Sequence, residues 1–437
     1  MLVVGLGASG RAAAHFLAER GAVVTANDSR DSVDEAEALA AAGVTLALGG
    51  HDEALFTRAE LIVLSPGVPP LAAVDAAEAA GVPIWSEIEL ASRFLNGTLV
   101  AITGTNGKST VTSLIAAMGD AAGIPTFAGG NLGTPLIEAV GTDAGERGLI
   151  VAEVSSFQLE RVDRFRPTVA VLLNVSEDHL DRYDDYAGYV AAKGNIFGAQ
   201  GATDHAVVPS DDQVCLGLAQ AGAAAVHTFG PDGELRIEDG KLRDAESGLE
   251  VPVEALALVG GPNELNSCAA ALAARLAGVE LAAIRSTLVS FRGLPHRMER
   301  VGEVKRVTFY DDSKATNVGA AVAAIKGFAG GVGKVVLIAG GKDKGGSYDP
   351  LREALASTGR GAVLIGEAAD LILDGLADVV PVQRRATMVE AVTAAFELAR
   401  PGDVVLLAPA CSSFDMYRSY AHRGDDFQDA VRALGAA

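Results

Sequence analysis

Short runs of Val, Leu and Ile alternate with Ala-rich segments along most of the chain. Apolar runs such as residues 2–5 and 61–67 have the length and composition of buried strands. The segments at 9–21 and 72–81 have helical composition and end in glycine, the residue that most often closes a helix. Strands that alternate with helices are joined by crossovers and form parallel sheets. The pattern therefore predicts an α/β fold built on parallel sheets.

The alternation breaks into three stretches. A chain of 437 residues is long for one hydrophobic core. Gly293 and Pro295 indicate a linker before the third stretch. Between about 202 and 257 the pattern becomes short, polar and broken by Gly and Asp, which predicts a small antiparallel β element rather than helix. We expect three domains, at residues 1–87, 88–293 and 294–437.

Composition narrows the class of partner. A net charge of -21 leaves no excess of Lys and Arg to meet a nucleic-acid backbone, although a small anionic ligand needs only a few local donors. We see no apolar run long enough for a membrane span and no basic region before a long apolar core at the start. Cys215, Cys268 and Cys411 are scattered, which fits buried packing in a reducing compartment. We expect a cytoplasmic protein that binds neither nucleic acid nor membrane.

A glycine-rich turn, GLGASG, follows the first predicted strand. Gly5, Gly7 and Gly10 match G-x-G-x-x-G, and Asp28 closes the second predicted strand, as in dinucleotide-binding folds. Such a turn directs backbone N–H groups and a helix N-terminus at a phosphate. A glycine turn without a ligand is the competing interpretation, and this pattern alone does not separate the two.

A second glycine-rich turn, TGTNGKST, lies between a predicted strand and a predicted helix. The usual phosphate-loop pattern requires a glycine where this chain has Ile102. Even so, Lys108 can neutralise the β- and γ-phosphates of a nucleotide, and Ser109 can bind Mg²⁺. A helix-capping turn would explain the glycines but not a lysine at a helix start, where the dipole disfavours a cation. The sequence therefore favours a nucleotide site.

Acidic residues follow two further strands of the second stretch. Glu153 ends one strand, and Asp178, His179 and Asp181 follow the next. Open α/β sheets bind ligands beyond the carboxyl ends of their strands, and oxygen ligands beside a phosphate loop suit Mg²⁺. From its sequence context alone, Lys193 reads as an ordinary solvated helix lysine.

Polar side chains also gather at the strand ends of the third stretch. Their concentration there, rather than along a helix face, favours a pocket for a carboxylate substrate over a set of ordinary loops. The residues concerned are Arg297, Asp311, Asp312, Lys314, Thr316, Lys342, Lys344, Ser412 and Ser413.

Together these motifs resemble the Mur ligases, the ATP-dependent amide-forming enzymes of peptidoglycan synthesis, over nearly the whole chain. The family's nucleotide loop has the short form T-G-T-N-G-K-[ST], which accounts for Ile102. The segments SPG at 65–67, DHLDRY at 178–183, DSKATN at 312–317 and PACSSFD at 409–415 resemble the members that add D-glutamate to UDP-N-acetylmuramoyl-L-alanine. The resemblance implies two Rossmann-like domains flanking a central domain of the phosphate-loop type.

The resemblance also implies a role for particular residues. The UDP substrate would be bound by Gly7, Ala8, Ser9, Asp28, Ser29, Gly67, Asn131, Ser155 and His179. ATP would be bound by Gly104, Thr105, Asn106, Gly107, Lys108, Ser109, Thr110, Asn263, Arg297 and Asp312. Mg²⁺ would be held by Ser109, Glu153, His179 and Lys193. D-glutamate would be bound by Lys314, Thr316, Lys344, Ser413 and Tyr420.

The implied activity proceeds through an acyl phosphate, with Lys108, His179 and Lys193 as catalytic residues and Lys193 carbamylated by CO₂. The implied partners are small-molecule substrates, and we expect a monomer. One departure is Pro262, which replaces a histidine of the family's G-x-H-N-x-x-N segment while Asn263 and Asn266 are kept. Three alternatives stay open: a nicotinamide-dependent oxidoreductase, a nucleotide-binding switch, and an amide ligase for another amino acid or for folate.

Overall fold

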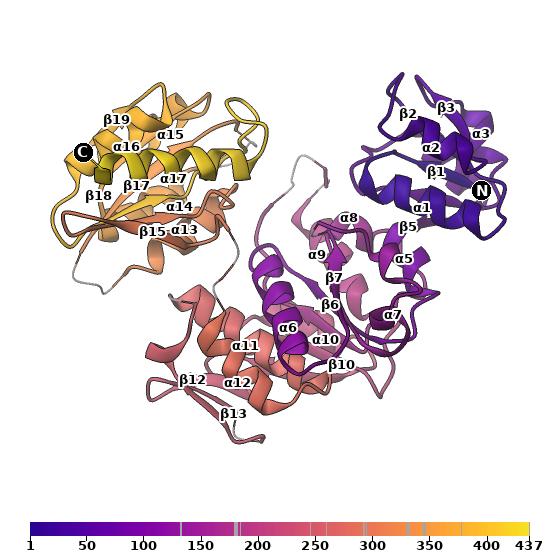
Figure 1. The fold of residues 1–437 in the computed structure, drawn as a ribbon, viewed down its shortest axis with the longest axis horizontal. Helices are drawn as coiled ribbons and strands as arrows, with labels where there is room; N and C mark the ends of the chain where they lie inside the picture. Colours follow the sequence, from indigo (N-terminus) through magenta and orange to yellow (C-terminus); the bar gives the residue numbers. More distant parts are fainter. Residues whose placement is uncertain are drawn as a thin grey trace. The chain divides into compact units, whose positions relative to one another are not determined.

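The computed structural model of the protein describes residues 1–131, 133–178, 182–183, 185–244, 246–258, 260–291, 293, 295–329, 333–343, 347–376 and 378–436. The described residues contain three β-sheets, of five, nine and six strands (Figure 1). Most strand pairs in them are parallel, and helices connect most of the parallel strands. The α/β prediction is confirmed.

The first sheet is parallel throughout, in the order β3-β2-β1-β4-β5. Its strands are β1 (Leu2–Val4), β2 (Thr25–Asp28), β3 (Thr45–Leu48), β4 (Ile62–Leu64) and β5 (Ile84–Ser86). The helices are α1 (Ala8–Glu19), α2 (Ala36–Ala41), α3 (Glu53–Thr57), α4 (Ala72–Ala79) and α5 (Glu87–Ser92).

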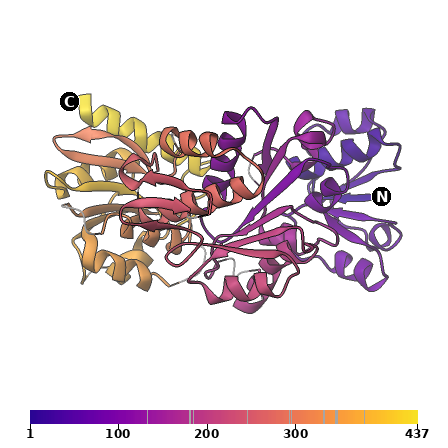
Figure 2. The same ribbon diagram turned by 90° about the horizontal axis from the view of Figure 1, so that it is seen from below.

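Helices cover both faces of this sheet (Figure 2). Val3 belongs to the same core as residues of α1 and α2, whereas its neighbours Leu2 and Val4 pack with α3 and α4. The alternation follows from the strand, in which successive side chains point to opposite faces. Gly21 and Gly81, which follow α1 and α4, have φ near +80°, so the expected glycine ends are present.

The central sheet has the order β14-β13-β12-β11-β10-β9-β6-β8-β7. Its strands are β6 (Thr98–Thr103), β7 (Thr126–Gly130), β8 (Leu149–Glu153), β9 (Val169–Leu172), β10 (His205–Pro209), β11 (Ala225–Phe229), β12 (Leu235–Glu238), β13 (Lys241–Asp244) and β14 (Leu249–Pro252). The helices are α6 (Lys108–Ala121), η1 (Leu136–Ala139), α7 (Asp143–Arg147), α8 (Ser156–Leu159), α9 (Tyr186–Gly194), η2 (Asn195–Phe197), α10 (Gln213–Gln220), η3 (Val253–Ala255), α11 (Gly261–Leu276) and α12 (Leu281–Ser290).

Strand β6 lies between β8 and β9 and is parallel to both. Its residues from Leu99 to Thr103 are buried, as are all the residues of β8 and β9, because parallel sheets are covered on both faces. The carboxyl ends of these three strands therefore meet at one edge of the sheet. The phosphate loop and Glu153 lie at that edge.

The predicted antiparallel element is real but smaller than expected. Strands β12, β13 and β14 pair in antiparallel fashion between 235 and 252. The expectation was wrong for 205–229, where β10, α10 and β11 continue the parallel sheet. Residues 210–212 and 221–224 are the connections at the two ends of α10.

The third sheet has the order β15-β16-β20-β17-β18-β19, and only its edge strand β15 is antiparallel to its neighbour. Its strands are β15 (Glu299–Val304), β16 (Val307–Asp311), β17 (Val335–Gly340), β18 (Gly359–Ile365), β19 (Val382–Arg384) and β20 (Val404–Leu407). The helices are α13 (Val318–Lys326), α14 (Asp349–Thr358), α15 (Ala369–Leu376), α16 (Met388–Leu398) and α17 (Tyr420–Ala436). Two cores, one on each face, hold these helices to the sheet.

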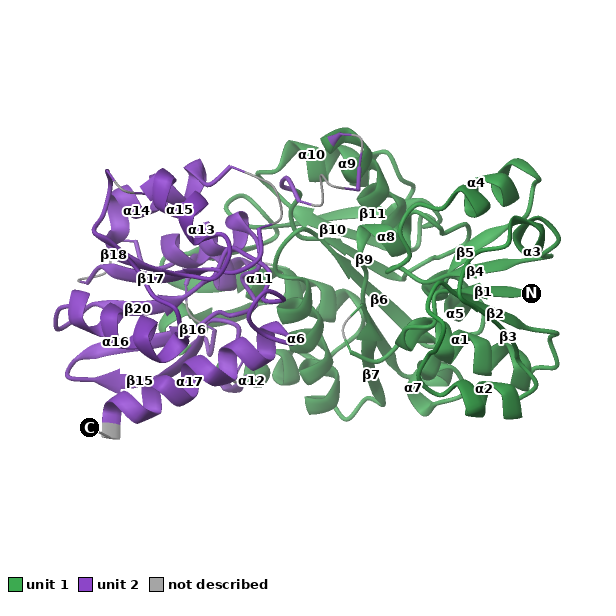
Figure 3. Ribbon diagram, turned by 90° about the horizontal axis from the view of Figure 1, so that it is seen from above, with its two compact units in different colours: residues 1–175, 186–255, 266–289 green, residues 176–185, 256–265, 290–437 purple. Residues whose placement is uncertain are grey.

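The chain divides into two compact units (Figure 3). Unit 1 is formed within 1–175, 186–255 and 266–289, and unit 2 within 176–185, 256–265 and 290–437. Each sheet lies inside one of the three expected domains, but the boundaries at 87/88 and 293/294 themselves stay predictions. The three cysteines are buried and free, as expected. Among the helices that the structure describes, none combines the length and the apolar character needed to cross a membrane.

Candidate active site

The loop between β6 and α6 depends on two glycines. Gly104 has φ +149° and Gly107 has φ +87°, conformations that L side chains rarely adopt. A Cβ on Gly107 would also lie 2.5 Å from Asn266 Oδ1, so a side chain there would collide with α11. These constraints explain why the chain has glycine at both positions.

Lys108 is the first residue of α6, and its ammonium group lies across the loop. Nζ donates to the carbonyls of Gly104, at 2.7 Å, and Thr105, at 2.8 Å. These two acceptors offset the unfavourable position of a cation at a helix N-terminus. The contacts hold the charge beside the loop, where a phosphate group bound to the loop would lie.

Asn174, which sequence reasoning missed, fastens the loop to the end of β9. Its Oδ1 accepts from the Asn106 N–H at 2.9 Å, and its Nδ2 donates to the Asn106 carbonyl at 3.1 Å. The Thr105 N–H donates to the Asn174 carbonyl at 3.1 Å. An asparagine that follows a buried strand is a weak sequence signal, because its partner is 68 positions away.

Glu153 joins the loop to the neighbouring strand. One carboxylate oxygen accepts a short hydrogen bond from Ser109 Oγ, and the other accepts from Asn131 Nδ2 at 2.8 Å. Ser109 and Glu153 are both buried. Hydroxyl and carboxylate oxygens are the ligands that Mg²⁺ prefers, so this pair fits a hard divalent cation beside bound phosphates.

Lys193 lies at the same loop. It is 2% exposed, which overturns its interpretation as a solvated helix lysine. Nζ donates to the Gly104 carbonyl at 3.0 Å and lies 4.6 Å from the centre of the Tyr189 ring. The Tyr189 hydroxyl is 3.1 Å from Thr105 Oγ1, so α9 contacts the loop through two residues of one helix face.

The remaining residues expected near this edge are spread over both units. Ser155 caps α8, where its Oγ accepts from the Gln158 N–H at 3.3 Å. Asp178 belongs to unit 2 and accepts from Asn317 Nδ2 at 3.2 Å. His179 and Asp181 lie outside the described residues.

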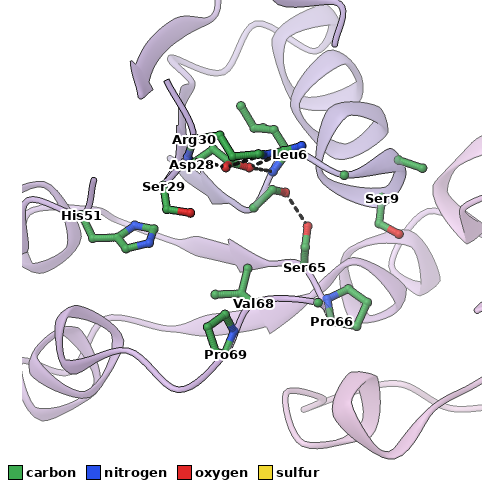
Figure 4. Close-up of a pocket in the computed structure, with 14 residues that line it drawn as sticks. Leu6, Ser9, Asp28, Ser29, Arg30, His51, Ser65, Pro66, Val68 and Pro69 are labelled. Atoms are coloured by element: carbon green, nitrogen blue, oxygen red, sulfur yellow. Dashed lines mark hydrogen bonds and ion pairs between the residues drawn. The ribbon is translucent and has the colours of Figure 1, made fainter. Parts of the chain in front are cut away.

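A pocket of about 430 Å³ opens at the carboxyl ends of the first sheet (Figure 4). All six residues expected there to bind the UDP part lie along its wall. The lining residues are Gly5, Leu6, Gly7, Ala8, Ser9, Asp28, Ser29, Arg30, His51, Ser65, Pro66, Gly67, Val68 and Pro69. Arg30 and His51 were not expected from the sequence.

Asp28 is held in the wall of this pocket by Arg30 and Leu6. Oδ1 accepts from the Arg30 backbone N–H and from Nε, and Oδ2 accepts from Arg30 Nη2 and the Leu6 N–H, at 2.7–3.0 Å. The side-chain hydrogen bond from Arg30 is the main cause that holds the pKa of Asp28 well below its usual range, against the effect of burial. Asp28 is therefore an anion whose four acceptor positions are all engaged.

In unit 2, a buried arginine organises the loops around the expected amino-acid site. Arg423 on α17 is 1% exposed and donates to Ser313 Oγ at 3.0 Å and to the Ser313 carbonyl at 2.9 Å. It also donates to the carbonyls of Cys411 and Ser412, at 3.2 and 3.3 Å. Burial lowers the pKa of Arg423 to about 10, so the group is charged at neutral pH. Arg423 thus ties together the loops that carry the neighbouring Lys314 and Ser413.

Lys314 Nζ lies 4.1 Å from the centre of the Tyr420 ring, an arrangement that favours a cation over an aromatic face. Ser413 is buried, and its carbonyl accepts from the Tyr417 N–H at 2.8 Å. Thr316 lies two residues along the same turn, where its N–H donates to the Lys314 carbonyl. The structure therefore brings together Lys314 and Tyr420, while Lys344 lies outside the described residues.

Three residues expected near the adenosine end of ATP also belong to unit 2, whereas the phosphate loop belongs to unit 1. Asp312 Oδ1 accepts from the Met298 N–H at 3.3 Å. Desolvation raises the pKa of Asp312 to about 7, although the charge of Arg297 acts in the opposite direction. Asn263 lies in the first turn of α11, next to Pro262, and proline is tolerated in a first turn.

Family models match three successive parts of the chain. Residues 1–86 match the Mur ligase MurD-like, N-terminal domain, residues 102–274 the Mur ligase middle domain, and residues 296–411 the Mur ligase, glutamate ligase domain. The matches follow the order of the three sheets.

Curated relatives match over the full length. The chain is 45% identical to the UDP-N-acetylmuramoylalanine–D-glutamate ligase of Geobacter metallireducens, over 100% of this chain and 97% of the relative. It is 46% identical to the ligase of the same name from Trichlorobacter lovleyi, over 99% and 98%. The chain belongs to the Mur ligase family.

Solved structures show the same fold at lower identity. A pseudomurein peptide ligase type C from Methanothermus fervidus is 19% identical, with 99% of each chain covered and a TM-score of 0.64. A MurF ligase from Thermotoga maritima in complex with ADP is 18% identical, with 94% of this chain and 89% of that chain covered and a TM-score of 0.62. These neighbours confirm the three-domain α/β architecture.

Proposed function

We propose that this protein joins D-glutamate to UDP-N-acetylmuramoyl-L-alanine in peptidoglycan precursor synthesis, with ATP as the energy source and ADP and phosphate as products. The observation that carries this conclusion is the 45% identity over the whole chain to relatives named for that reaction. The loop geometry supports the ATP part, because the Lys108 ammonium group lies at the glycine-rich loop and Ser109 contacts Glu153 at the same sheet edge.

The use of ATP follows from the chemistry of a carboxylate. An amine cannot displace oxide from the L-alanyl carboxylate, because oxide is too poor a leaving group. Transfer of the γ-phosphoryl group to a carboxylate oxygen makes an acyl phosphate, and the amine of D-glutamate then forms the amide and expels phosphate. Lys108 would stabilise the charge on the transferring group. His179 would take the proton from the amine, in the role that the sequence predicts for it.

Mg²⁺ would be held by Ser109 and Glu153, with Lys193 as a further ligand. His179 would be a further ligand only in steps in which it does not act as the base, since a neutral imidazole has one nitrogen with a lone pair. When bound, the ion would polarise the phosphate oxygens and neutralise their charge. Lys193 could join this set only as a carbamate, because an ammonium group has no lone pair. Its burial beside the Gly104 carbonyl supports a site role. The carbamate stays a proposal.

The two organic substrates would use the other sheets. The first-sheet pocket would hold the UDP part, with Asn131 and Ser155 toward the sugar and pyrophosphate. In unit 2, Lys314, Thr316, Lys344, Ser413 and Tyr420 would hold D-glutamate, since a lysine held over an aromatic ring offers one cation to a carboxylate. The cytoplasmic location and the monomeric state stay predictions.

An amino-acid panel in a phosphate-release assay tests the proposal. Turnover should require UDP-N-acetylmuramoyl-L-alanine and D-glutamate together. Turnover with L-alanine, a diamino acid or a dipeptide in place of D-glutamate would assign a different ligase. ATP binding without amino-acid-dependent release would point to a nucleotide switch, and tight nicotinamide binding would point to an oxidoreductase.

A further inference from the structure

We propose that His51 makes the first-sheet pocket selective for uracil, by accepting a hydrogen bond from N3–H of the base on its Nε2 atom. The inference rests on the proposed function, which puts the UDP part of the substrate in this pocket. It concerns a residue that the sequence motifs did not indicate, and it follows from the hydrogen bonds behind the histidine.

Asn27 fixes which nitrogen of His51 carries the proton. Its Nδ2 donates to the carbonyls of Ala47 and Gly50, at 2.7 Å each, so the amide cannot be turned the other way without losing both bonds. Oδ1 of Asn27 therefore faces His51 Nδ1, at 2.6 Å. Since an amide oxygen can only accept, His51 Nδ1 must be the donor. Asn27 is 1% exposed, which keeps water from competing for these bonds.

The protonation of Nδ1 leaves Nε2 of the neutral ring as a pure acceptor. The ring is half-buried and meets the Phe56 ring edge to face, with centroids 5.9 Å apart and an interplanar angle of 89°. In Figure 4 the imidazole projects into the pocket between Ser29 on one side and Val68 and Pro69 on the other. Packing from behind and the bond to Asn27 thus hold one acceptor at a defined place in the wall.

The other polar side chains of the pocket are less able to discriminate between bases. Asp28 would be the obvious acceptor, but Arg30 and Leu6 already engage its four lone-pair positions. The hydroxyls of Ser9 and Ser29 can rotate and act as donor or acceptor. A hydroxyl that can act as donor or acceptor can form a hydrogen bond with uracil or with cytosine, and so does not distinguish between them. His51, with its tautomer set by Asn27, has a single role.

Uracil and cytosine differ at the atom that this acceptor would meet. N3 of uracil carries a hydrogen and donates, whereas N3 of cytosine has a lone pair and accepts. The lone pair on His51 Nε2 would accept a hydrogen bond from N3–H of uracil and would repel the lone pair on N3 of cytosine. Sites built around one directed hydrogen bond reject the analogue that cannot make it, because the buried group is then left without a partner.

The test is isothermal titration of the full chain with UDP and with CDP. The unaltered protein should bind UDP at least about 10-fold more tightly than CDP. His51→Leu should weaken UDP binding about 10-fold and should not weaken CDP binding, so that the preference disappears. His51→Gln, whose amide can donate or accept, should restore binding of both nucleotides without the preference. His15→Leu removes a histidine of α1 outside the pocket and should keep the preference in full.

Retention of the UDP preference by a folded His51→Leu variant would overturn the inference, and so would equal binding of UDP and CDP by the unaltered protein. In both cases ligation of D-glutamate would continue, and the proposed function would stand. If the unaltered protein bound no UDP and performed no ligation, the proposed function would fail and this inference with it.

Discussion

Unit 1 contains two glycine-rich turns of similar design, one in the first sheet and one in the central sheet. Each follows a buried strand, β1 or β6, and leads into a helix, α1 or α6. Each needs glycine for the same reason, since Gly5 has φ +83° and Gly107 has φ +87°. The backbone of both turns directs N–H groups toward the carboxyl edge of a parallel sheet.

The two turns differ in the charges around them. Helix α1 begins with the uncharged residues Ala8 and Ser9, and the nearby anion Asp28 is engaged by Arg30. Helix α6 begins with Lys108 and Ser109, and Ser109 contacts Glu153. A neutral turn suits a group that is only held, whereas a turn with a cation and a cation-binding carboxylate suits a phosphate that is transferred. We therefore infer that the same type of turn serves recognition in the first sheet and chemistry in the central sheet.

The largest expected effect comes from Lys108→Ala. This change removes the cation that we propose stabilises the transferring phosphoryl group, and the rate of ligation should fall at least about 10³-fold. UDP binding at the first turn should be unchanged, as measured by titration. Lys326→Ala, a change at an exposed helix lysine, is the matched control. If Lys108→Ala lost UDP affinity by as large a factor as it lost ligation rate, the two turns would not act separately.

Lys193→Ala should lower the rate of ligation about 100-fold, because the variant loses a group that we propose as a ligand of the metal. If the group is a carbamate, added formate or acetate should restore part of the activity in initial-rate assays. The same salts should have no effect on Lys108→Ala. Unchanged activity in Lys193→Ala would contradict a site role for this buried lysine.

Gly10→Ala tests whether the first turn depends on close backbone contact. A Cβ on Gly10 would lie 1.9 Å from the Gly5 carbonyl oxygen, so the turn must shift. We expect a loss of stability of about 1–3 kcal/mol and weaker UDP binding, with the ATP affinity of the second turn unchanged. Gly7→Ala is the control for stability, since a Cβ there meets nothing within 4 Å. Equal unfolding midpoints for the two variants would refute the steric argument.

Glu87, on α5, joins the two regions through its bond from the Ile137 N–H on η1. Burial raises its pKa from 4.5 to about 7, and Oε2 has no hydrogen-bond partner within the described part of the chain. The stabilising, protonated form is fully present below pH 4.5 and is lost as the pH rises through about 7.

Glu87→Gln stays neutral at all these pH values. Its free energy of unfolding, relative to that of the unaltered protein, should therefore rise from pH 5 to pH 8, by at most about 3 kcal/mol. Urea unfolding at both pH values measures the difference. Glu37→Gln, at an exposed position of α2, should show no such trend. A constant difference across this pH range would mean that Glu87 stays ionised in the folded protein.

Local pattern was enough to predict the parts of the site that lie within one turn. Gly104 and Gly107 adopt positive φ within the turn, Lys108 donates to carbonyls of the same turn, and Glu153 is placed by the rule that sheet ligands lie at strand ends. The parallel sheets followed from the alternation of apolar runs and helices. The error at 205–229 arose because the polar pattern of the antiparallel strands was extended to the residues before them, where a short helix joins two parallel strands.

The residues that were missed depend on contacts between distant parts of the chain. Asn174 meets Asn106 across two strands, and His51 acquires a fixed tautomer only from Asn27. The sequence around Lys193 is that of an ordinary helix, and its burial against the loop is apparent only from the tertiary structure. Only the family resemblance indicated a role for it.

The central claim is that the phosphate bound by the second turn activates a carboxylate, and an isotope experiment tests it directly. UDP-N-acetylmuramoyl-L-alanine labelled with ¹⁸O in the alanyl carboxylate would be converted with ATP and D-glutamate. An acyl phosphate requires one labelled carboxylate oxygen to leave with the inorganic phosphate, which mass spectrometry would detect in step with amide formation. Phosphate that contains no ¹⁸O while the amide forms would contradict the account.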